Sequence, residues 1–328
     1  MDRVGLPTAV ITPQTIIATR LRRPDAATIV EPARPRITGH IADRLPPGLA
    51  ARFELAEQLG VGGEARVYRA IRRPDGREVA VKVFGPGIVP RYLYPLGSPQ
   101  HRRAFSPAHS VEVYERVSED GCHVEVMEYC GYGTLAGVVN ARGLQGRLLA
   151  EVIEQTATAL LAMHPVVHGD VKPSNILIRR LEPLQLVLSD FGLSTDLGDR
   201  SRVTNVGLGS RVYMAPEADA SLRPACDWWS LGISIVELAT GWHPMRRPDG
   251  SWPTIPELSR MLSAPIDLSG IGDGRVRQLV RGLLVHDHRQ RWGDAEVARW
   301  LAGVNPVVAR GNGGFEARLA PRTSTSVI

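Results

Sequence analysis

The stretch HGDVKPSNILI, residues 168–178, decides how the rest of this chain is interpreted. Within a few positions it combines an aspartate, a lysine and an asparagine, and an apolar run follows. A carboxylate can accept the proton of a hydroxyl, an ammonium can neutralise phosphate charge, and an amide oxygen suits a hard cation such as Mg²⁺. The pattern therefore predicts phosphoryl transfer, with Asp170 and Lys172 as catalytic residues and Asn175 as a metal ligand. Leu177, in the apolar run, is expected to pack beneath a bound base.

A glycine-rich segment, LGVGGEARVYRA at residues 59–70, is typical of a strand, a turn and a second strand. Gly60 and Gly62 would let backbone amides approach phosphate oxygens, because no Cβ intervenes. On its own such a segment is more often an ordinary hairpin turn.

VAVK, residues 79–82, follows on the next expected strand. Strand alternation puts Ala80 and Lys82 on the same face, with Ala80 small enough to admit a base and Lys82 reaching phosphates. Among the 39 Lys and Arg residues of the chain, only Lys82 and Lys172 are lysines. Both fall inside these motifs, which favours a need for a compact ammonium at each position.

Three later motifs complete the pattern. In SDFG, Asp190 ends an expected strand and is predicted to bind the metal, while Phe191 packs inward. Glu217 ends MAPE and needs a cation when buried, for which Arg291 is the predicted partner. Asp227 begins DWWSLG and is expected to accept hydrogen bonds from the backbone of the catalytic loop.

Strand signals come first and helix signals dominate later, which predicts an α+β, two-lobed fold. A small antiparallel-sheet lobe would span residues 51–130, and a larger, mainly helical lobe residues 131–302. Segments rich in Pro, Thr, Arg, Gly and Ser suggest flexible tails at residues 1–50 and 303–328. A cleft between two such lobes is a common place for a ligand.

Composition narrows the possible partners. The net charge of +5 comes from the two tails, since the body balances 29 basic against 29 acidic residues, and this argues against nucleic-acid binding. The cysteines Cys122, Cys130 and Cys226 form no pairable framework, so reduced thiols and a cytoplasmic location are expected. No apolar run approaches the ~20 residues that span a bilayer.

With these motifs in their observed order, the chain from about residue 53 to 303 resembles the eukaryotic-type protein serine/threonine kinase family. The resemblance implies a two-lobed fold, ATP and Mg²⁺ as cofactors, and transfer of the γ-phosphoryl group to a protein hydroxyl. Lys172 within DxKPxN matches the serine/threonine variant. Gly169, however, stands where the family usually has arginine before the catalytic aspartate.

The resemblance also implies a nucleotide site. Met127 would be the gatekeeper residue, and the backbones of Glu128 and Cys130 would bond the base. The full implied set is Leu59, Gly60, Val61, Gly62, Val67, Ala80, Lys82, Met127, Glu128, Cys130 and Leu177. Lys82 would also serve catalysis.

The glycine before the catalytic aspartate raises two questions. Small-molecule kinases of the aminoglycoside type also read His-Gly-Asp, but they lack the Ala-Pro-Glu segment and the Asp-x-Trp-Ser-x-Gly helix that this chain has. A protein kinase is therefore favoured. Without an arginine at Gly169, a phosphate on Ser201 or Thr204 would lack its usual partner, so we expect activity not to depend strictly on phosphorylation of that loop.

A second departure concerns the partner of Lys82. The family pairs this lysine with a helix glutamate, but no acid occurs between Lys82 and Glu112, and five prolines predict a short, distorted or absent helix there. Asp190 could hold Lys82 directly, or Glu112 could reach it. Two functions stay open. The chain is either an active enzyme, for which an activating protein partner could order residues 84–110, or a nucleotide-binding pseudokinase scaffold.

Overall fold

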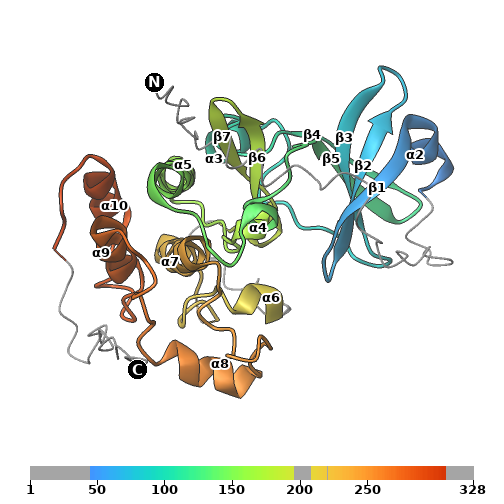
Figure 1. Cartoon of the computed structure of the whole chain (residues 1–328). Coiled ribbons are helices and arrows are strands. Elements are labelled where there is room, and N and C mark those ends of the chain that lie inside the picture. The colour runs from blue at the N-terminus through green and yellow to red at the C-terminus, as the bar shows by residue number, and fades with distance from the viewer. Residues whose placement is uncertain (1–44, 196–207, 220, 308–328) are drawn as a thin grey trace, which may run out of the picture.

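The computed structural model describes residues 45–195, 208–219 and 221–307 of the 328-residue chain. Along the chain, a five-stranded antiparallel sheet comes first, and mainly helical structure follows it (Figure 1). The strands are β1 (Phe53–Val61), β2 (Ala65–Arg72), β3 (Arg77–Phe84), β4 (Val113–Glu119) and β5 (Cys122–Glu128), in the order β1-β2-β3-β5-β4. This arrangement confirms the predicted two-lobed α+β fold.

The two faces of the sheet have different tasks because side chains alternate along each strand. On β3, Val79, Val81 and Val83 point into the small-lobe core, which also contains Leu49. That leucine comes from α2 (Pro47–Arg52), a short helix beside the sheet (Figure 1). Alternation leaves Lys82 on the opposite face, as the sequence predicts. Because α2 begins at Pro47, helical structure starts four residues before the predicted lobe boundary at residue 51.

Between β3 and β4 the structure contains one short helix, α3 (Pro99–Ala104). Ser98 caps its N-terminus by accepting a hydrogen bond from the amide of His101 at 3.1 Å. Prolines at positions 86, 90 and 95 leave loop rather than helix before it, since proline removes a helix donor and clashes with the preceding turn. Of the three outcomes that the sequence left open, a short, a distorted or an absent helix, the structure has the short one, and its six residues include no acid.

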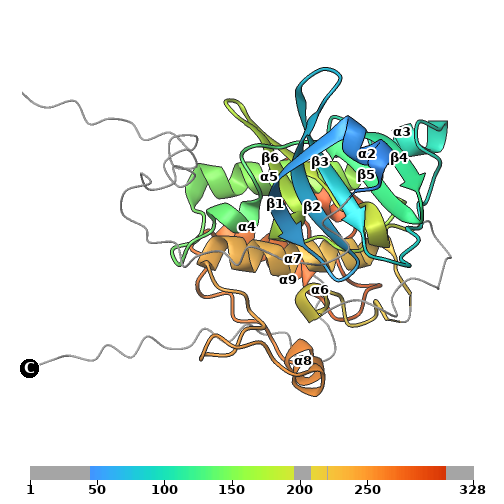
Figure 2. The ribbon, with the colours of Figure 1, turned by 90° about the vertical axis from the view of Figure 1, so that its right-hand side faces the viewer.

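The larger lobe packs helices around a second, separate core. Its helices are α4 (Leu135–Val138), α5 (Gly146–Met163), α6 (Leu208–Arg211), α7 (Pro224–Thr240), α8 (Ile255–Leu262), α9 (Gly274–Leu283) and α10 (Asp294–Leu301). A hairpin of β6 (Ile176–Leu181) and β7 (Leu184–Leu188), with the short turns η2 (Pro173–Asn175) and η3 (Phe191–Leu193), carries the catalytic segment. Figure 2 shows α7 running beneath the sheet, between the sheet and α8.

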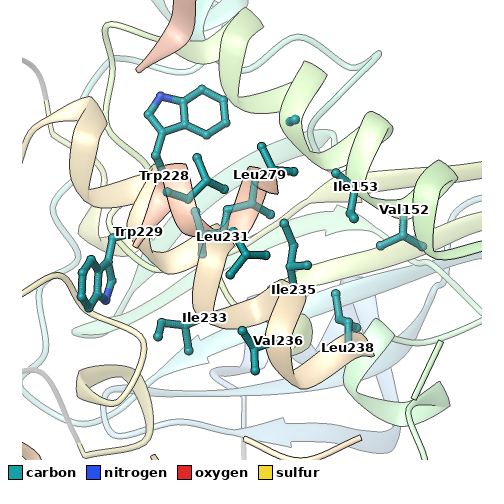
Figure 3. Packing of buried hydrophobic residues seen from close by; sticks show 14 of the residues in the cluster. Val152, Ile153, Trp228, Trp229, Leu231, Ile233, Ile235, Val236, Leu238 and Leu279 are labelled. Atoms are coloured by element: carbon teal, nitrogen blue, oxygen red, sulfur yellow. The ribbon is translucent and has the colours of Figure 1, made fainter. Parts of the chain in front are cut away.

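Helix α7 forms the centre of this core. Apolar residues surround it on nearly all sides, which is the pattern of a fully buried helix. Trp228 and Trp229 are completely buried, and Val152 and Ile153 of α5 face the helix from one side (Figure 3). A rigid central helix gives the catalytic segment a fixed support. None of the helices in the described parts of the chain is long and apolar enough to cross a bilayer.

Candidate active site

The catalytic segment is anchored on α7 through its backbone. The amides of His168 and Gly169 donate to the two carboxylate oxygens of Asp227, at 2.7 and 2.8 Å. Asp227 lies in the first turn of α7, and its side chain is almost completely buried. The predicted role of Asp227 is thus confirmed, and two backbone donors at the turn before Asp170 are satisfied.

Asp170 lies at the centre of a compact polar cluster. Its Oδ2 accepts hydrogen bonds from Lys172 Nζ at 2.7 Å and from Asn175 Nδ2 at 2.9 Å. Asn175 Nδ2 also donates to the backbone carbonyl of Asp170 at 2.8 Å. The three residues named from the sequence are therefore brought together, and Asp170 is held in one orientation by two donors.

One member of this cluster was missed from the sequence. Lys172 Nζ also donates to Ser210 Oγ at 2.7 Å, from α6 at the far end of the segment that follows Asp190. Lys172 thus links Asp170 to the Ser210 hydroxyl, which lies 38 positions after Lys172 in the chain. Ser210 lies four residues before the MAPE motif, but no local sequence pattern identifies it as a partner of Lys172.

Gly169 has a conformational reason to be glycine. Its φ is +80°, in the left-handed region that L side chains avoid. A Cβ added there would approach the backbone oxygen of Leu193 to 3.0 Å. Glycine at position 169 therefore avoids the backbone strain that an arginine would have beside Asp170. Ser201 and Thr204, the predicted phosphorylation positions, lie outside the described residues.

Lys82 bonds directly to Asp190 across the lobes. The distance from Lys82 Nζ to Asp190 Oδ1 is 2.6 Å. Burial lowers the pKa of Lys82, but the attraction of Asp190 outweighs it and the net shift is upward. Burial likewise raises the pKa of Asp190, yet Lys82 brings it below its usual value. Both groups are charged near neutral pH.

Of the two partners that the sequence left open for Lys82, Asp190 is the one found. Glu112 instead lies at the edge of the small lobe, where its backbone carbonyl accepts the amide of Glu128 at 2.9 Å. Glu115, the next acid, bonds Arg52 of α2 at 2.5 Å. The acid that does lie opposite Lys82 was missed: it is Glu125, its direct neighbour across β3 and β5.

The residues expected to surround the base come from both lobes. Ala80 of β3 is buried and lies opposite Met127 of β5 in the strand register. Val67 lies opposite Lys82 from the other side, on β2. Leu177 is the second residue of β6 and forms an isolated bridge with Thr134. Ala80, Lys82 and Met127 thus share one face of the sheet.

The glycine segment forms the β1–β2 turn. Leu59, Gly60 and Val61 end β1, and the side chains of Leu59 and Val61 are exposed. Gly62 follows, and its amide donates to the carbonyl of Ala65 at 2.8 Å. Nothing lies within 4 Å of a Cβ added at Gly60, so the space beside this turn is open.

The connection between the lobes is held by a partly buried arginine. Arg179 of β6 forms two 2.6 Å bonds with the carboxylate of Glu128, through Nε and Nη2. It also donates to the carbonyls of Pro107 and Ser110, at 2.6 and 3.0 Å. These four bonds of Arg179, called the Arg179 strut below, fix the side chain of Glu128. Glu128 is one of the residues expected to bond the base through its backbone. Sequence reasoning did not find Arg179.

Cys130, next along this connection, is buried, and burial raises the pKa of its thiol to about 12. Its thiol is therefore neutral at physiological pH. Its backbone carbonyl accepts the amide of Gly133 at 3.1 Å. Because a carbonyl oxygen can accept two hydrogen bonds, both the amide and the carbonyl of Cys130 could bond a base, and this backbone role stays a prediction.

Phe191 packs inward beside the catalytic segment, as predicted. Its ring lies 4.6 Å from that of Phe105, which ends α3, and 5.2 Å from the ring of His168. Asp190 itself adopts φ +62°, an unusual conformation for aspartate. The short helix α3, the segment at Asp190 and the catalytic loop are thus stacked together.

The predicted pair of Glu217 and Arg291 is confirmed. Arg291 donates to both carboxylate oxygens of Glu217, at 2.6 and 3.1 Å, and its guanidinium group is fully buried. Arg291 also bonds the carbonyl of Ala225 at 2.8 Å, which links the segment after the active site to the start of α7.

The residues present suit a nucleotide with Mg²⁺. Asp190 offers a carboxylate, and Asn175 has its amide nitrogen bound to Asp170, which leaves the amide oxygen as its metal-binding atom. Lys82 supplies a partly buried ammonium, paired with Asp190. No group of three or more His, Cys, Asp or Glu residues suited to a metal occurs among the residues that the structure describes. This donor set fits a cation that shares its ligands with phosphate oxygens, as Mg²⁺ does.

Comparison with known proteins agrees with this geometry. The family model for the protein kinase domain matches residues 53–300, which is most of the chain. The chain belongs to the protein kinase domain family. Among curated proteins, it is similar to serine/threonine-protein kinase 4 homolog B of Dictyostelium discoideum, with 31% identity over 240 residues. That match covers 67% of this chain and 21% of the relative, so the chain corresponds to about a fifth of that protein's length.

The protein kinase domain accounts for the order of the elements described above. Its matched range begins with β1 at Phe53 and ends at Trp300 in α10. All the site residues predicted from the sequence fall within it. Members of this family are typically phosphotransferases that bind ATP and act on protein substrates.

Proposed function

We propose that this chain is an ATP- and Mg²⁺-dependent serine/threonine protein kinase. The observation that carries the proposal is the cluster at Asp170, in which Lys172 and Asn175 hold one carboxylate oxygen at 2.7 and 2.9 Å. A carboxylate fixed in this way can orient an acceptor hydroxyl and take its proton during in-line transfer.

Serine/threonine specificity has its own support. Lys172 lies two positions after Asp170 and reaches the Ser210 hydroxyl, so a cation stands beside the place where a small acceptor would enter. The similarity to a relative named as a serine/threonine-protein kinase points the same way. Lys172 would neutralise charge on the transferred phosphoryl group.

The nucleotide would occupy the cleft between the lobes. When bound, ATP supplies the γ-phosphoryl group, with Mg²⁺ held by Asp190 and Asn175. Lys82 would then bind phosphate oxygens. Ala80, Met127 and Leu177 would enclose the base, and the connection at Glu128 and Cys130 would offer backbone bonds to it.

A pseudokinase scaffold remains the second candidate, because α3 has no acid to pair with Lys82. In that case the chain would bind nucleotide and act through a protein partner. Retention of Lys82, Asp170, Asn175 and Asp190 favours the enzyme, since a scaffold needs none of these four polar side chains for its core.

The test is transfer of labelled phosphate from ATP with Mg²⁺, to the protein itself and to a generic basic substrate. The full chain is assayed beside Asp170→Asn and Asp120→Asn, the latter an exposed turn residue. We expect label with the wild type and Asp120→Asn, and a loss of at least a hundredfold with Asp170→Asn. Nucleotide binding without transfer in any of the three proteins would reject the enzyme and favour the scaffold.

Independence from loop phosphorylation is a further expectation, because Gly169 offers no cation to a phosphate. Alanine at both Ser201 and Thr204 should leave kcat within about threefold of the wild type. The variant is compared with phosphatase-treated wild type in the same transfer assay. Loss of activity in both samples would contradict the expectation.

A further inference from the structure

Three charged residues form a row across the sheet beneath the nucleotide cleft. In the strand register, Arg116 of β4 lies opposite Glu125 of β5, and Glu125 lies opposite Lys82 of β3. Directly opposed residues on neighbouring antiparallel strands have side chains on the same face, with Cβ atoms about 5 Å apart. The row therefore alternates in charge, from positive to negative to positive, and ends at Lys82.

The row is largely removed from solvent. The side chains of Arg116, Glu125 and Lys82 are 16, 13 and 15% exposed. Burial raises the pKa of Glu125, and the two cations oppose that shift. Because a buried carboxylate is costly unless it is paired, a position that only filled the core would hold an apolar residue. The place of Glu125 between two cations therefore calls for an electrostatic explanation.

Lys82 needs a second anion for a specific reason. Its bonded partner is Asp190, at 2.6 Å. Under the proposed function, Asp190 would turn its carboxylate toward Mg²⁺, and that bond would weaken. Neither α3 nor the rest of residues 83–111 carries an acid that could take over. Glu125 already lies on the strand beside Lys82.

We propose that Glu125 is the positioning residue for Lys82. It takes the place of a helix acid, which α3 lacks. This inference rests on the proposed function and names a residue that acts through Lys82, without touching the nucleotide. Arg116 holds Glu125 from the far side, with Nε 3.5 Å from Glu125 Oε1. A carboxylate placed between the two cations keeps the ammonium of Lys82 oriented on the cleft face.

Arg116 connects this row to the proline-rich segment before α3. Its guanidinium group lies 3.8 Å from the centre of the Tyr92 ring, and Nη1 donates to the carbonyl of Tyr94 at 3.0 Å. The row thus depends on the path of residues 85–98. In a kinase domain whose α3 supplies no acid, this segment takes part in positioning Lys82 through Arg116 and Glu125.

The first test exploits the fact that Lys82 and Lys172 are the only lysines of the chain. The full-length protein, without nucleotide, is acylated with a small amine-reactive ester at one pH, and peptide mass spectrometry gives the rate at each lysine. Only the neutral amine reacts, so loss of a neighbouring anion speeds the reaction. Lys172 is the internal reference.

We expect Glu125→Gln to raise the acylation rate of Lys82 relative to Lys172 by roughly tenfold, because a partly buried charge one strand away shifts proton affinity by about that factor. Arg116→Gln should change the rate in the opposite direction, since it removes a cation. Glu78→Gln, which alters an exposed acid on β3, should have no effect. Asp190→Asn, combined with Glu125→Gln, should enlarge the increase.

The second test concerns catalysis. Glu125→Gln should lower kcat about tenfold with a smaller change in KM for ATP, and Glu125→Asp should lie between it and the wild type. Unchanged acylation of Lys82 in Glu125→Gln would overturn the inference. If that variant does not fold, Arg116→Gln decides, and an unchanged rate there would overturn it equally. Acylation needs neither nucleotide nor transfer, so an inactive wild type would refute the proposed function and leave this test intact.

Discussion

At the residue scale, Gly169 shows how one position can serve two purposes. Its positive φ turns the backbone so that its own amide and that of His168 both reach Asp227. A side chain there would be strained and would crowd Leu193. Glycine at position 169 therefore avoids a strained backbone, which favours stability. It also leaves no cation here for a phosphate on the following loop.

We expect Gly169→Ala to lower the free energy of unfolding by about 1–3 kcal/mol, since an L residue at this φ is strained and its Cβ meets a backbone oxygen. Urea unfolding of the two proteins measures the difference. Gly272→Ala is the matched control, because that glycine has no positive φ and open space around it. Equal losses in both variants would show that the left-handed conformation is not the cause.

A second residue-scale prediction concerns His164, whose side chain is buried between two acids. Nδ1 lies 2.8 Å from Asp294 Oδ1 and Nε2 lies 3.3 Å from Asp227 Oδ2. Burial lowers the pKa of this imidazole, but the bonds to Asp227 and Asp294 outweigh it and raise the pKa to about 9. The charged imidazolium therefore connects the base of the catalytic segment to α10.

A raised pKa in the folded state stabilises the protein below the unfolded pKa of about 6.5, and this contribution is lost as pH rises toward about 9. At most it amounts to about 3 kcal/mol. We expect the free energy of unfolding to fall across this interval in the wild type and to change much less in His164→Gln. Denaturant unfolding at several pH values measures it, and parallel profiles would contradict the assignment.

At the element scale, the connection between β5 and the larger lobe depends on β6. Arg179 of β6 bonds Glu128 twice and two backbone carbonyls besides, so one side chain fixes the end of β5. Its neighbour Arg180 points away and is exposed. The two arginines form a natural pair for comparison on a single strand.

Arg179→Met should lower the free energy of unfolding by about 2–3 kcal/mol, because Glu128 keeps a partly buried charge without its partner. It should also weaken nucleotide binding several-fold, since the backbone of Glu128 loses its support. Arg180→Met should change neither quantity appreciably. Denaturant unfolding and nucleotide-binding titrations are carried out on both variants. Similar unfolding free energies and similar nucleotide affinities for the two would show that Arg179 has no special role in holding Glu128.

The elements themselves differ in how far the sequence predicts them. The strands carrying Ala80 and Lys82, and α7 with Asp227, follow from alternation and from an apolar surround, which are local patterns. Proline positions predict that any helix before β4 is short, distorted or absent, and do not decide among these. The partners Glu125, Ser210 and Arg179 do not follow, because strand register and tertiary approach bring them to their contacts. A carboxylate 43 positions after Lys82 has no local signal that marks it as its neighbour.

At the scale of the whole molecule, the two lobes have separate cores and meet through polar contacts and a small apolar cluster, in which Ala104 and Phe105 pack with Met163 and Val166. The pair of Lys82 and Asp190 joins them at the cleft, and the strut at Arg179 joins them at the connection. Because each lobe has its own core and the apolar cluster that joins them is small, relative motion of the lobes is the expected behaviour. A ligand that binds both lobes should therefore stabilise the whole chain.

We expect a non-hydrolysable ATP analogue with Mg²⁺, at a concentration of about 100 Kd, to raise the free energy of unfolding by about 2.7 kcal/mol. The corresponding rise in Tm is about 5 °C for a domain of this size. The analogue alone should give a smaller rise, because Asp190 and Asn175 then have no cation through which to reach the phosphates. Asp190→Asn should abolish the part that depends on Mg²⁺, whereas Asp120→Asn should retain it. Thermal unfolding of the three proteins, with and without the metal, tests this, and an undiminished effect of Mg²⁺ in Asp190→Asn would place the cation elsewhere.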